Sequence, residues 1–188
     1  RGAVATASGH AAQFITFFTL MEPGDEFIAS KNLYGGSITQ FGISFKKLGW
    51  NCKFVDPSNP QNFKKALTKK TKAIFLEVLA NPSGIVVDLE EIVKIANEAE
   101  IPVIVDNTMA SPFLLKPIDW GADLVIHSTT KYLNGHGTSM GGCIVEKGDF
   151  DWKQGSKFPT MTEPYEGYHG LSFAEEFGPA AFTMRARA

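Results

Sequence analysis

Apolar residues along the chain fall into two kinds of run that alternate with each other. The runs IPVIVD (101–106) and ADLVIHS (122–128) contain almost no polar alternation, which is typical of strands covered on both faces. In LEEIVKIANEAE (89–100), by contrast, the apolar residues recur at helical spacing, and Asp88 precedes them as an N-cap. Strands that alternate with helices in this way predict an α/β domain with a mostly parallel, doubly wound sheet.

The same pattern places the remaining elements. Strands are expected at 25–30, 52–56, 73–78, 101–106, 122–128 and 141–147, and helices at 8–21, 36–48, 61–68 and 89–100. A further helix is expected to start in FAEEFGPAAFTMRARA (173–188), and the given sequence ends without a Gly, Asn or Pro that would close it. Residues 1–188 are therefore interpreted as one domain, and as a segment of a longer polypeptide.

Polar side chains follow several of the predicted strands. Asp106 ends one of them, Ser128, Thr130 and Lys131 follow another, and Asn81 lies just beyond AIFLEV. In doubly wound sheets, ligands bind at the carboxyl ends of the strands. We therefore expect these side chains to surround a ligand site.

Lys131 is the first candidate for chemistry. Its position directly after a buried strand suggests a desolvated amine, with a lowered pKa and enough nucleophilicity to attack a carbonyl. A lysine that extends from a strand end to solvent is the more common explanation of the position alone. The position of Lys131 therefore leaves both interpretations open.

Other residues suit an anionic or flat ligand. The residues after Asp106 make a poor helix start, which weakens the interpretation of Asp106 as a helix cap. A buried carboxylate that pairs with a protonated pyridine nitrogen is the competing interpretation. Ser8 and Gly9 open a helix whose amides could bind a phosphate, although most such starts are only caps. Tyr34 stands before a glycine pair, so its ring could stack on a flat ligand.

Composition and charge exclude several classes of protein. Hydrophobic residues make up 44% of the chain and charged residues 20%, as in ordinary globular domains, and the net charge of −2 gives no reason to expect nucleic acid or a membrane as partner. The chain has no dinucleotide or phosphate-loop glycine motif and no close metal-ligand spacing, so no metal is expected. Its two cysteines are expected to be buried thiols, which favours a cytoplasmic protein.

Five motifs carry a resemblance to a known family. ASGHAA, NLYGGS, ANPSG, VDNTMASP and HSTTKYLNGHG follow one another across nearly the whole chain. In this order they resemble the Cys/Met-metabolism family of enzymes that depend on pyridoxal 5'-phosphate (PLP), which has the aspartate-aminotransferase type of fold. His10 stands where many relatives have Met or Gln, and Met109 stands where Phe is common. Neither residue removes a required chemical group.

The resemblance implies a role for each candidate. Lys131 would form the Schiff base and move protons, Asp106 would keep the ring nitrogen protonated, and Tyr34 would stack on the ring. The remaining cofactor-binding residues implied by the resemblance are Ser8, Gly9, His10, Ser128 and Thr130 at the phosphate, and Asn81 and Thr108 near the ring.

Two segments narrow the subgroup. GHGTSMGG, with Thr138, and the segment that ends in YHG are similar to the O-acetylhomoserine sulfhydrylase branch. The implied reaction is γ-replacement: O-acetyl-L-homoserine and sulfide, or a thiol, would give homocysteine, or a relative, and acetate. The resemblance also implies a homo-oligomer, a dimer of dimers, in which a partner subunit and a C-terminal small domain complete the active site.

Three alternatives remain open at this point. A lyase of the same family could degrade methionine or cystathionine. The chain could be a non-catalytic fragment that acts only in assembly. A dehydrogenase with a dinucleotide-binding fold is disfavoured by the absent glycine motif.

Overall fold

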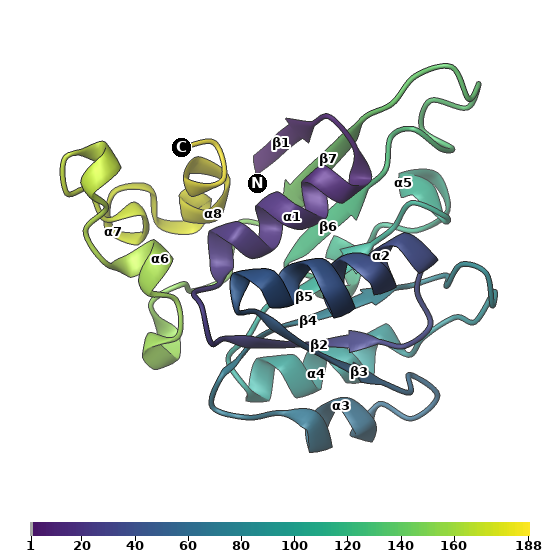
Figure 1. Ribbon diagram of the computed structural model, residues 1–188, viewed down its shortest axis with the longest axis horizontal. Helices are drawn as coiled ribbons and strands as arrows, with labels where there is room; N and C mark the ends of the chain where they lie inside the picture. The colour runs from purple at the N-terminus through teal and green to yellow at the C-terminus, as the bar shows by residue number, and fades with distance from the viewer. Residues whose placement is uncertain (1) are drawn as a thin grey trace.

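A computed structural model describes residues 2–188, which form a central sheet with helices on both faces (Figure 1). The seven strands lie in the order β1-β7-β6-β5-β4-β2-β3. Their bounds are β1 (Gly2–Thr6), β2 (Glu26–Ser30), β3 (Asn51–Val55), β4 (Thr71–Glu77), β5 (Val103–Asp106), β6 (Leu124–His127) and β7 (Gly142–Glu146). Only β7 runs antiparallel to its neighbours β1 and β6. The predicted α/β fold with a mostly parallel sheet is confirmed.

The helices are mostly short. They are α1 (Gly9–Leu20), α2 (Gly35–Thr39), α3 (Gln61–Ala66), α4 (Leu89–Glu98), α5 (Ser111–Leu114), α6 (Pro159–Thr162), α7 (Phe173–Phe177) and α8 (Ala181–Arg185). After α2 the chain continues through a π-helical turn (Gln40–Ser44) and a 3₁₀ turn (Phe45–Leu48). Further 3₁₀ turns lie at Pro117–Trp120, Gln154–Ser156, Glu166–Tyr168 and Gly178–Ala180.

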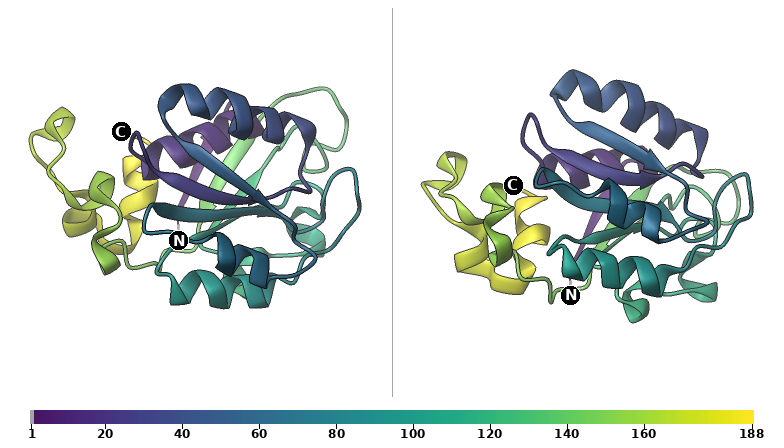
Figure 2. Two further views of the ribbon diagram at one scale, coloured as in Figure 1. Left: turned by 60° about the horizontal axis from the view of Figure 1, so that its bottom comes forward. Right: turned by 90° about the horizontal axis from the view of Figure 1, so that it is seen from below.

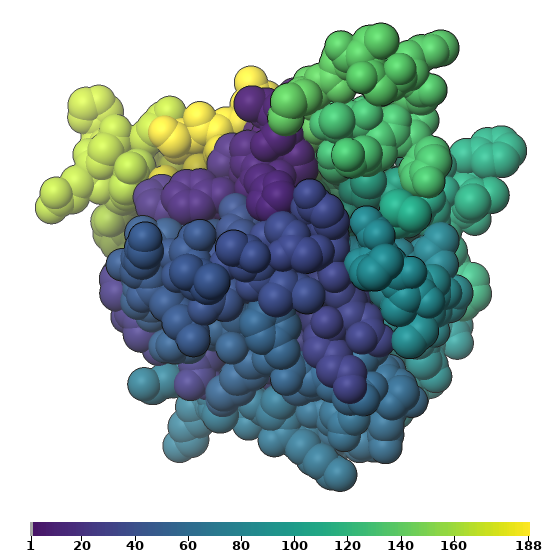
Figure 3. Space-filling view, turned by 45° about the vertical axis from the view of Figure 1, so that its right-hand side comes forward, coloured from purple at the N-terminus to yellow at the C-terminus, as the bar shows by residue number. Residues whose placement is uncertain are grey.

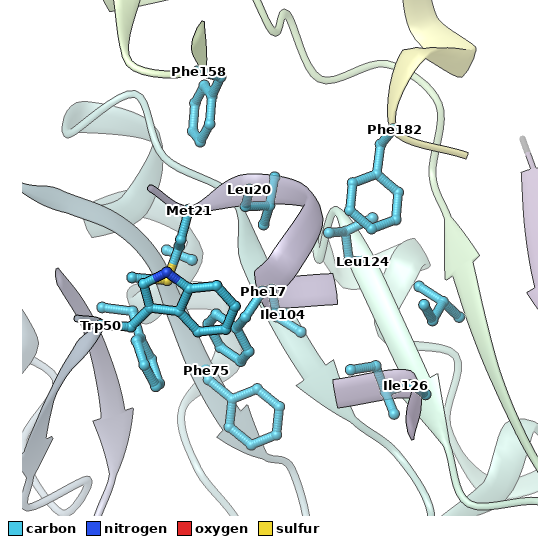
Figure 4. Packing of buried hydrophobic residues seen from close by; sticks show 14 of the residues in the cluster. Phe17, Leu20, Met21, Trp50, Phe75, Ile104, Leu124, Ile126, Phe158 and Phe182 are labelled. Carbon is cyan, nitrogen blue, oxygen red and sulfur yellow. The ribbon is translucent and has the colours of Figure 1, made fainter. Parts of the chain in front are cut away.

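The sheet separates two hydrophobic cores. Figure 2 shows the helices that cover the two faces of the sheet. On one face, α4 and α3 bury the apolar side chains of β4 and β5. On the other face, α1 and the helical segment after Tyr34 pack on the sheet, and α6, α7 and α8 extend the same core. Figure 4 shows Phe17 of α1 in the middle of this second core, between Trp50 and Ile104. The ring centroids of Phe17 and Phe27 lie 4.1 Å apart.

Most predicted elements are present, and two differences have clear causes. The sequence pattern missed β1, whose alanines and glycine favour strands weakly and whose residues alternate between exposed and half-buried at the sheet edge. The final helix is not continuous, because Gly178 adopts a positive φ of 51° and Pro179 follows it. The chain therefore forms α7 and α8 with a 3₁₀ turn between them.

Residues 2–188 include both cysteines of the chain. Cys52 on β3 and Cys143 on β7 are free thiols that are only partly buried, and burial raises the pKa of both. Within this range no helix has both the length and the apolar character that a membrane span requires. Nor do three or more metal-ligating side chains gather in the same described part.

Candidate active site

The carboxyl ends of the parallel strands open onto a cleft of about 740 Å³. All ten residues that the sequence predicts for the cofactor site line it. They are Ser8, Gly9, His10, Tyr34, Asn81, Asp106, Thr108, Ser128, Thr130 and Lys131. In Figure 3, the loop between β6 and β7 (green) stands out from the body of the molecule near the start of α1 (dark purple).

The start of α1 approaches the end of β6 very closely. Ser8 caps the helix, since its hydroxyl accepts a hydrogen bond from the amide of Ala11 at 3.1 Å. Gly9 is required here, because a Cβ at this position would lie 2.8 Å from Cβ of Ser128 and 3.2 Å from its Cα. The first amides of a helix have no partners within it and carry partial positive charge, so this corner suits a phosphate.

Asp106 lies at the floor of the cleft, where burial raises the pKa of its carboxyl. The Thr108 amide and hydroxyl both donate to its Oδ1, at 3.0 and 2.5 Å. Gln13 Nε2 donates to its Oδ2 at 3.3 Å. These hydrogen bonds favour the ionised form and oppose the effect of burial on the pKa. Oδ2, with its single long hydrogen bond, is the oxygen best able to receive a further donor.

Thr108 also connects Asp106 to the loop after β6. Its hydroxyl accepts a hydrogen bond from the Ser128 amide at 2.8 Å while it donates to Asp106. Thr130 is engaged differently: its hydroxyl donates to the carbonyl of Gly141 at 3.2 Å and accepts from the amide of Gly141 at 3.1 Å. Thr130 therefore holds the two ends of the protruding loop together, and a phosphate would have to share its hydroxyl with Gly141.

The environment of Lys131 corrects the argument from desolvation. Lys131 is exposed, since it lies four residues beyond β6 in a loop that projects past the sheet. Lys131 is therefore not buried beside the strand, as the argument from desolvation assumed. Lys131 nevertheless lines the same cleft as Asp106.

Tyr34 and His10 lie next to each other in the lining of the cleft. Their ring centroids lie 5.8 Å apart in an edge-on arrangement, and Tyr34 is 49% exposed, so a face of its ring is available for stacking. Gly36 allows this approach, because a Cβ there would lie 2.5 Å from Cε1 of Tyr34 and 2.7 Å from Cε1 of His10. Gly36 thus lets Tyr34 and His10 lie close to the backbone of α2, and the stacking of Tyr34 on a ligand stays a prediction.

Sequence reasoning missed two polar residues of the cleft, Gln13 and Glu77. Gln13 is buried on α1 and joins Asp106 to the Ser37 hydroxyl of α2, to which its Nε2 donates at 2.9 Å. Glu77 ends β4, and its carboxylate accepts from the amides of Tyr34 and Asn81. A glutamate at the end of the fully buried strand TKAIFLE was the signal that could have identified it.

The cleft fits a flat, anionic cofactor with a basic ring nitrogen. Within residues 2–188 it offers a partly buried carboxylate that forms no salt bridge, the first amides of α1, an exposed aromatic ring and the amine of Lys131. PLP needs a group of each kind: a carboxylate at the ring nitrogen, amides at the phosphate, a ring to stack on and a lysine.

Comparison with protein families decides the assignment. The model of the Cys/Met metabolism PLP-dependent enzymes matches residues 1–179. The chain belongs to this family. The predicted resemblance is thereby confirmed.

Similar members of the family have related names. The chain is 47% identical over 187 residues to a homocysteine/cysteine synthase from Kluyveromyces lactis, with 98% of this chain and 42% of that protein covered. It is 45% identical over 193 residues to an O-acetyl-L-homoserine sulfhydrylase from Leptospira meyeri, with 98% and 43% covered. The chain thus spans less than half the length of these curated relatives.

A solved structure shows the same fold. A protein from Campylobacter jejuni described as an O-acetylhomoserine (thiol)-lyase, which contains N'-pyridoxyl-lysine-5'-monophosphate, superimposes with a TM-score of 0.94 at 34% sequence identity. The match covers 99% of this chain and 46% of that one.

Proposed function

We propose that residues 1–188 form the PLP-binding large domain of an enzyme that carries out γ-replacement on O-acetyl-L-homoserine. Sulfide or a thiol would be the second substrate, and homocysteine (or methionine, if methanethiol is the thiol) and acetate the products. The observation that carries this proposal is the convergence of Asp106, the start of α1 and Lys131 on one cleft. The names of the family's similar members support the choice of substrates.

The residues of the cleft divide the binding of PLP between them. Ser8, Gly9, His10, Ser128 and Thr130 would hold the phosphate, and Asp106 would bind the ring nitrogen through Oδ2, with Thr108 holding the carboxylate in place. Tyr34 would stack on the ring, and Asn81 would bind near its phenolic oxygen and the substrate carboxylate. When bound, PLP withdraws electrons from the substrate carbon that loses its proton.

Lys131 would hold PLP covalently through its amine and would then act as the acid and base. Once displaced by the substrate, the amine removes the proton from the α-carbon and helps to move a proton from the β-carbon, so that acetate can leave from the γ-carbon. Lys131 lines the cleft and is exposed, which supports this role. Thr138, in the loop that carries Lys131, supports the sulfhydrylase branch.

A product assay with the full-length protein tests this proposal. Purified protein with PLP is incubated with O-acetyl-L-homoserine and sulfide, and homocysteine, acetate and ammonia are measured. Homocysteine and acetate in equal amounts, without net ammonia release, support γ-replacement, and Lys131→Ala should abolish both products. Ammonia release as the main result would make the protein a lyase. No turnover of the full-length protein would favour a domain that acts only in assembly.

We further propose that the full-length protein is a cytoplasmic homo-oligomer, a dimer of dimers. Exposed apolar side chains on α1 and the segment after Tyr34 support an interface, with Phe14, Phe18 and Ile43 exposed by 38%, 57% and 62%. The free thiols of Cys52 and Cys143 suit a reducing compartment. Light scattering of the full-length protein would give the number of subunits.

A further inference from the structure

Glu77 links two separate loops of the cleft through one buried carboxylate. It is 4% exposed at the end of β4, and its two oxygens have different partners. Oε1 accepts from the amide of Tyr34 at 2.7 Å, and Oε2 accepts from the amide of Asn81 at 2.9 Å. The first amide belongs to the segment after β2 and the second to the segment after β4, so a single side chain sets the distance between the two.

Both of the loops that Glu77 binds present a side chain to the cleft. Tyr34 directly precedes α2, where the amide of Ser37 donates to its carbonyl, so the position of Tyr34 also sets the start of that helix. Asn81 is half-buried and lines the same cleft. A shift of either amide away from Glu77 would therefore move a residue that faces the ligand.

We infer that Glu77 is a positioning residue, whose ionised carboxylate holds Tyr34 and Asn81 at the spacing that the cofactor ring requires. The inference rests on the proposed function for the identity of the ligand. Glu77 itself need not touch PLP, because it acts through the two backbone amides. An ionised carboxylate can accept at both oxygens, whereas a protonated carboxyl carries a donor at one of them. One of the two hydrogen bonds is therefore lost when Glu77 takes up a proton.

The groups around Glu77 bring the pH at which its carboxylate takes up a proton close to neutral. Burial and, to a smaller extent, the negative charge of Asp106 on β5 raise the pKa of Glu77, and hydrogen bonds from the two amides lower it. Together these effects raise the pKa to about 7. The other titratable groups that face the cleft are His10 and Tyr34 on one wall and Lys131 and Tyr132 on the rim. His127 on β6 acts on Asp106, and burial keeps the pKa of that imidazole low.

The experiment measures PLP binding to the full-length protein between pH 6 and pH 8.5 without substrate. The variant Glu77→Gln keeps the shape of the side chain but places an amide donor opposite one backbone N–H. Loss of one hydrogen bond to a charged group weakens binding about 10-fold or more. We therefore expect the Kd of Glu77→Gln for PLP to be about 10-fold higher than that of the wild type at pH 8.5. Wild-type affinity should fall as the pH drops through 7, whereas the affinity of Glu77→Gln should be low and change less. Glu90→Gln, an exposed glutamate on α4, is the matched control and should behave as the wild type.

A second readout does not depend on the cofactor. Hydrogen exchange of the cofactor-free protein reports the protection of the Tyr34 and Asn81 amides relative to their intrinsic rates. Glu77→Gln, or wild type below pH 7, should lose protection at one or both of these amides, while the core amides of β4 keep theirs. Unchanged protection and an unchanged pH dependence of PLP binding in Glu77→Gln would overturn the inference. If the wild type binds no PLP at all, the proposed function fails, and the exchange data alone still decide whether Glu77 holds the two loops.

Discussion

Thr108→Val removes the hydroxyl that connects Asp106 to the loop after β6, at nearly constant side-chain volume. The hydroxyl donates to Oδ1 of Asp106 at 2.5 Å and accepts from the amide of Ser128 at 2.8 Å. Loss of a hydrogen bond to a charged group costs about 1.5–3 kcal/mol, and an amide left without a partner costs about 1–3 kcal/mol when buried. Because Thr108 and Ser128 are only partly buried, water offsets part of this cost, and we expect a total of about 2–4 kcal/mol.

Urea denaturation of the full-length protein gives the free energy of unfolding of Thr108→Val, wild type and Thr108→Ser. The serine variant keeps the hydroxyl and should lie close to the wild type. Because the lost hydrogen bond stabilises the ionised carboxylate, the pKa of Asp106 should rise further in Thr108→Val. The difference from wild type should therefore be largest at high pH and should shrink as the pH falls through the raised pKa of Asp106. A Thr108→Val protein within about 0.5 kcal/mol of wild type, or an equally unstable Thr108→Ser, would refute this reasoning.

Three further changes test the fold and the site. Gly9→Ala should weaken PLP binding by about 10-fold or more in a titration, because the new Cβ would clash with Ser128. A Cβ at Gly35 would have no neighbour within 4 Å, so the control Gly35→Ala should leave binding unchanged. Phe17→Ala should lower the free energy of unfolding in urea by about 3–5 kcal/mol, and Phe18→Ala, at a position that is 57% exposed, by less than about 1 kcal/mol. Burial raises the pKa of Asp123 to about 6, so its buried charge destabilises the fold above that pH and this cost disappears as the pH falls toward 4. The free energy of unfolding of the wild type, measured in urea, should therefore rise on the order of 2–3 kcal/mol relative to that of Asp123→Asn between pH 7 and pH 4. If the two free energies change in parallel with pH, the raised pKa of Asp123 is contradicted.

The sequence was sufficient for the strands that lie inside the sheet and for the residues that follow them. Runs such as IPVIVD, which are short and rich in β-branched residues, favour a strand buried on both faces. The polar residue at the end of such a strand then lies at the edge of the sheet where ligands bind. Asp106 could be predicted from this pattern together with the family motifs. The structure also places the other predicted residues along the same cleft.

The residues that the sequence analysis missed depend on partners that are distant in the chain. Gln13 bonds with Asp106 across 93 positions, and Glu77 bonds with Tyr34 across 43, and neither spacing follows from local periodicity. The exposure of Lys131 could not be predicted for a related reason, since it depends on how far the loop after β6 projects. A strand pattern fixes where that loop begins but not the path it takes.

Covalent binding of PLP to Lys131 tests the central claim most directly. The visible spectrum of the full-length protein is recorded after reconstitution with PLP, before and after treatment with borohydride, and the labelled peptide is then identified by mass spectrometry. The proposed function predicts a yellow protein whose band borohydride removes, a pyridoxyl group fixed on Lys131, and no such band in Lys131→Ala. A reconstituted protein that takes up no PLP, or a pyridoxyl group on another lysine with full binding in Lys131→Ala, would contradict it.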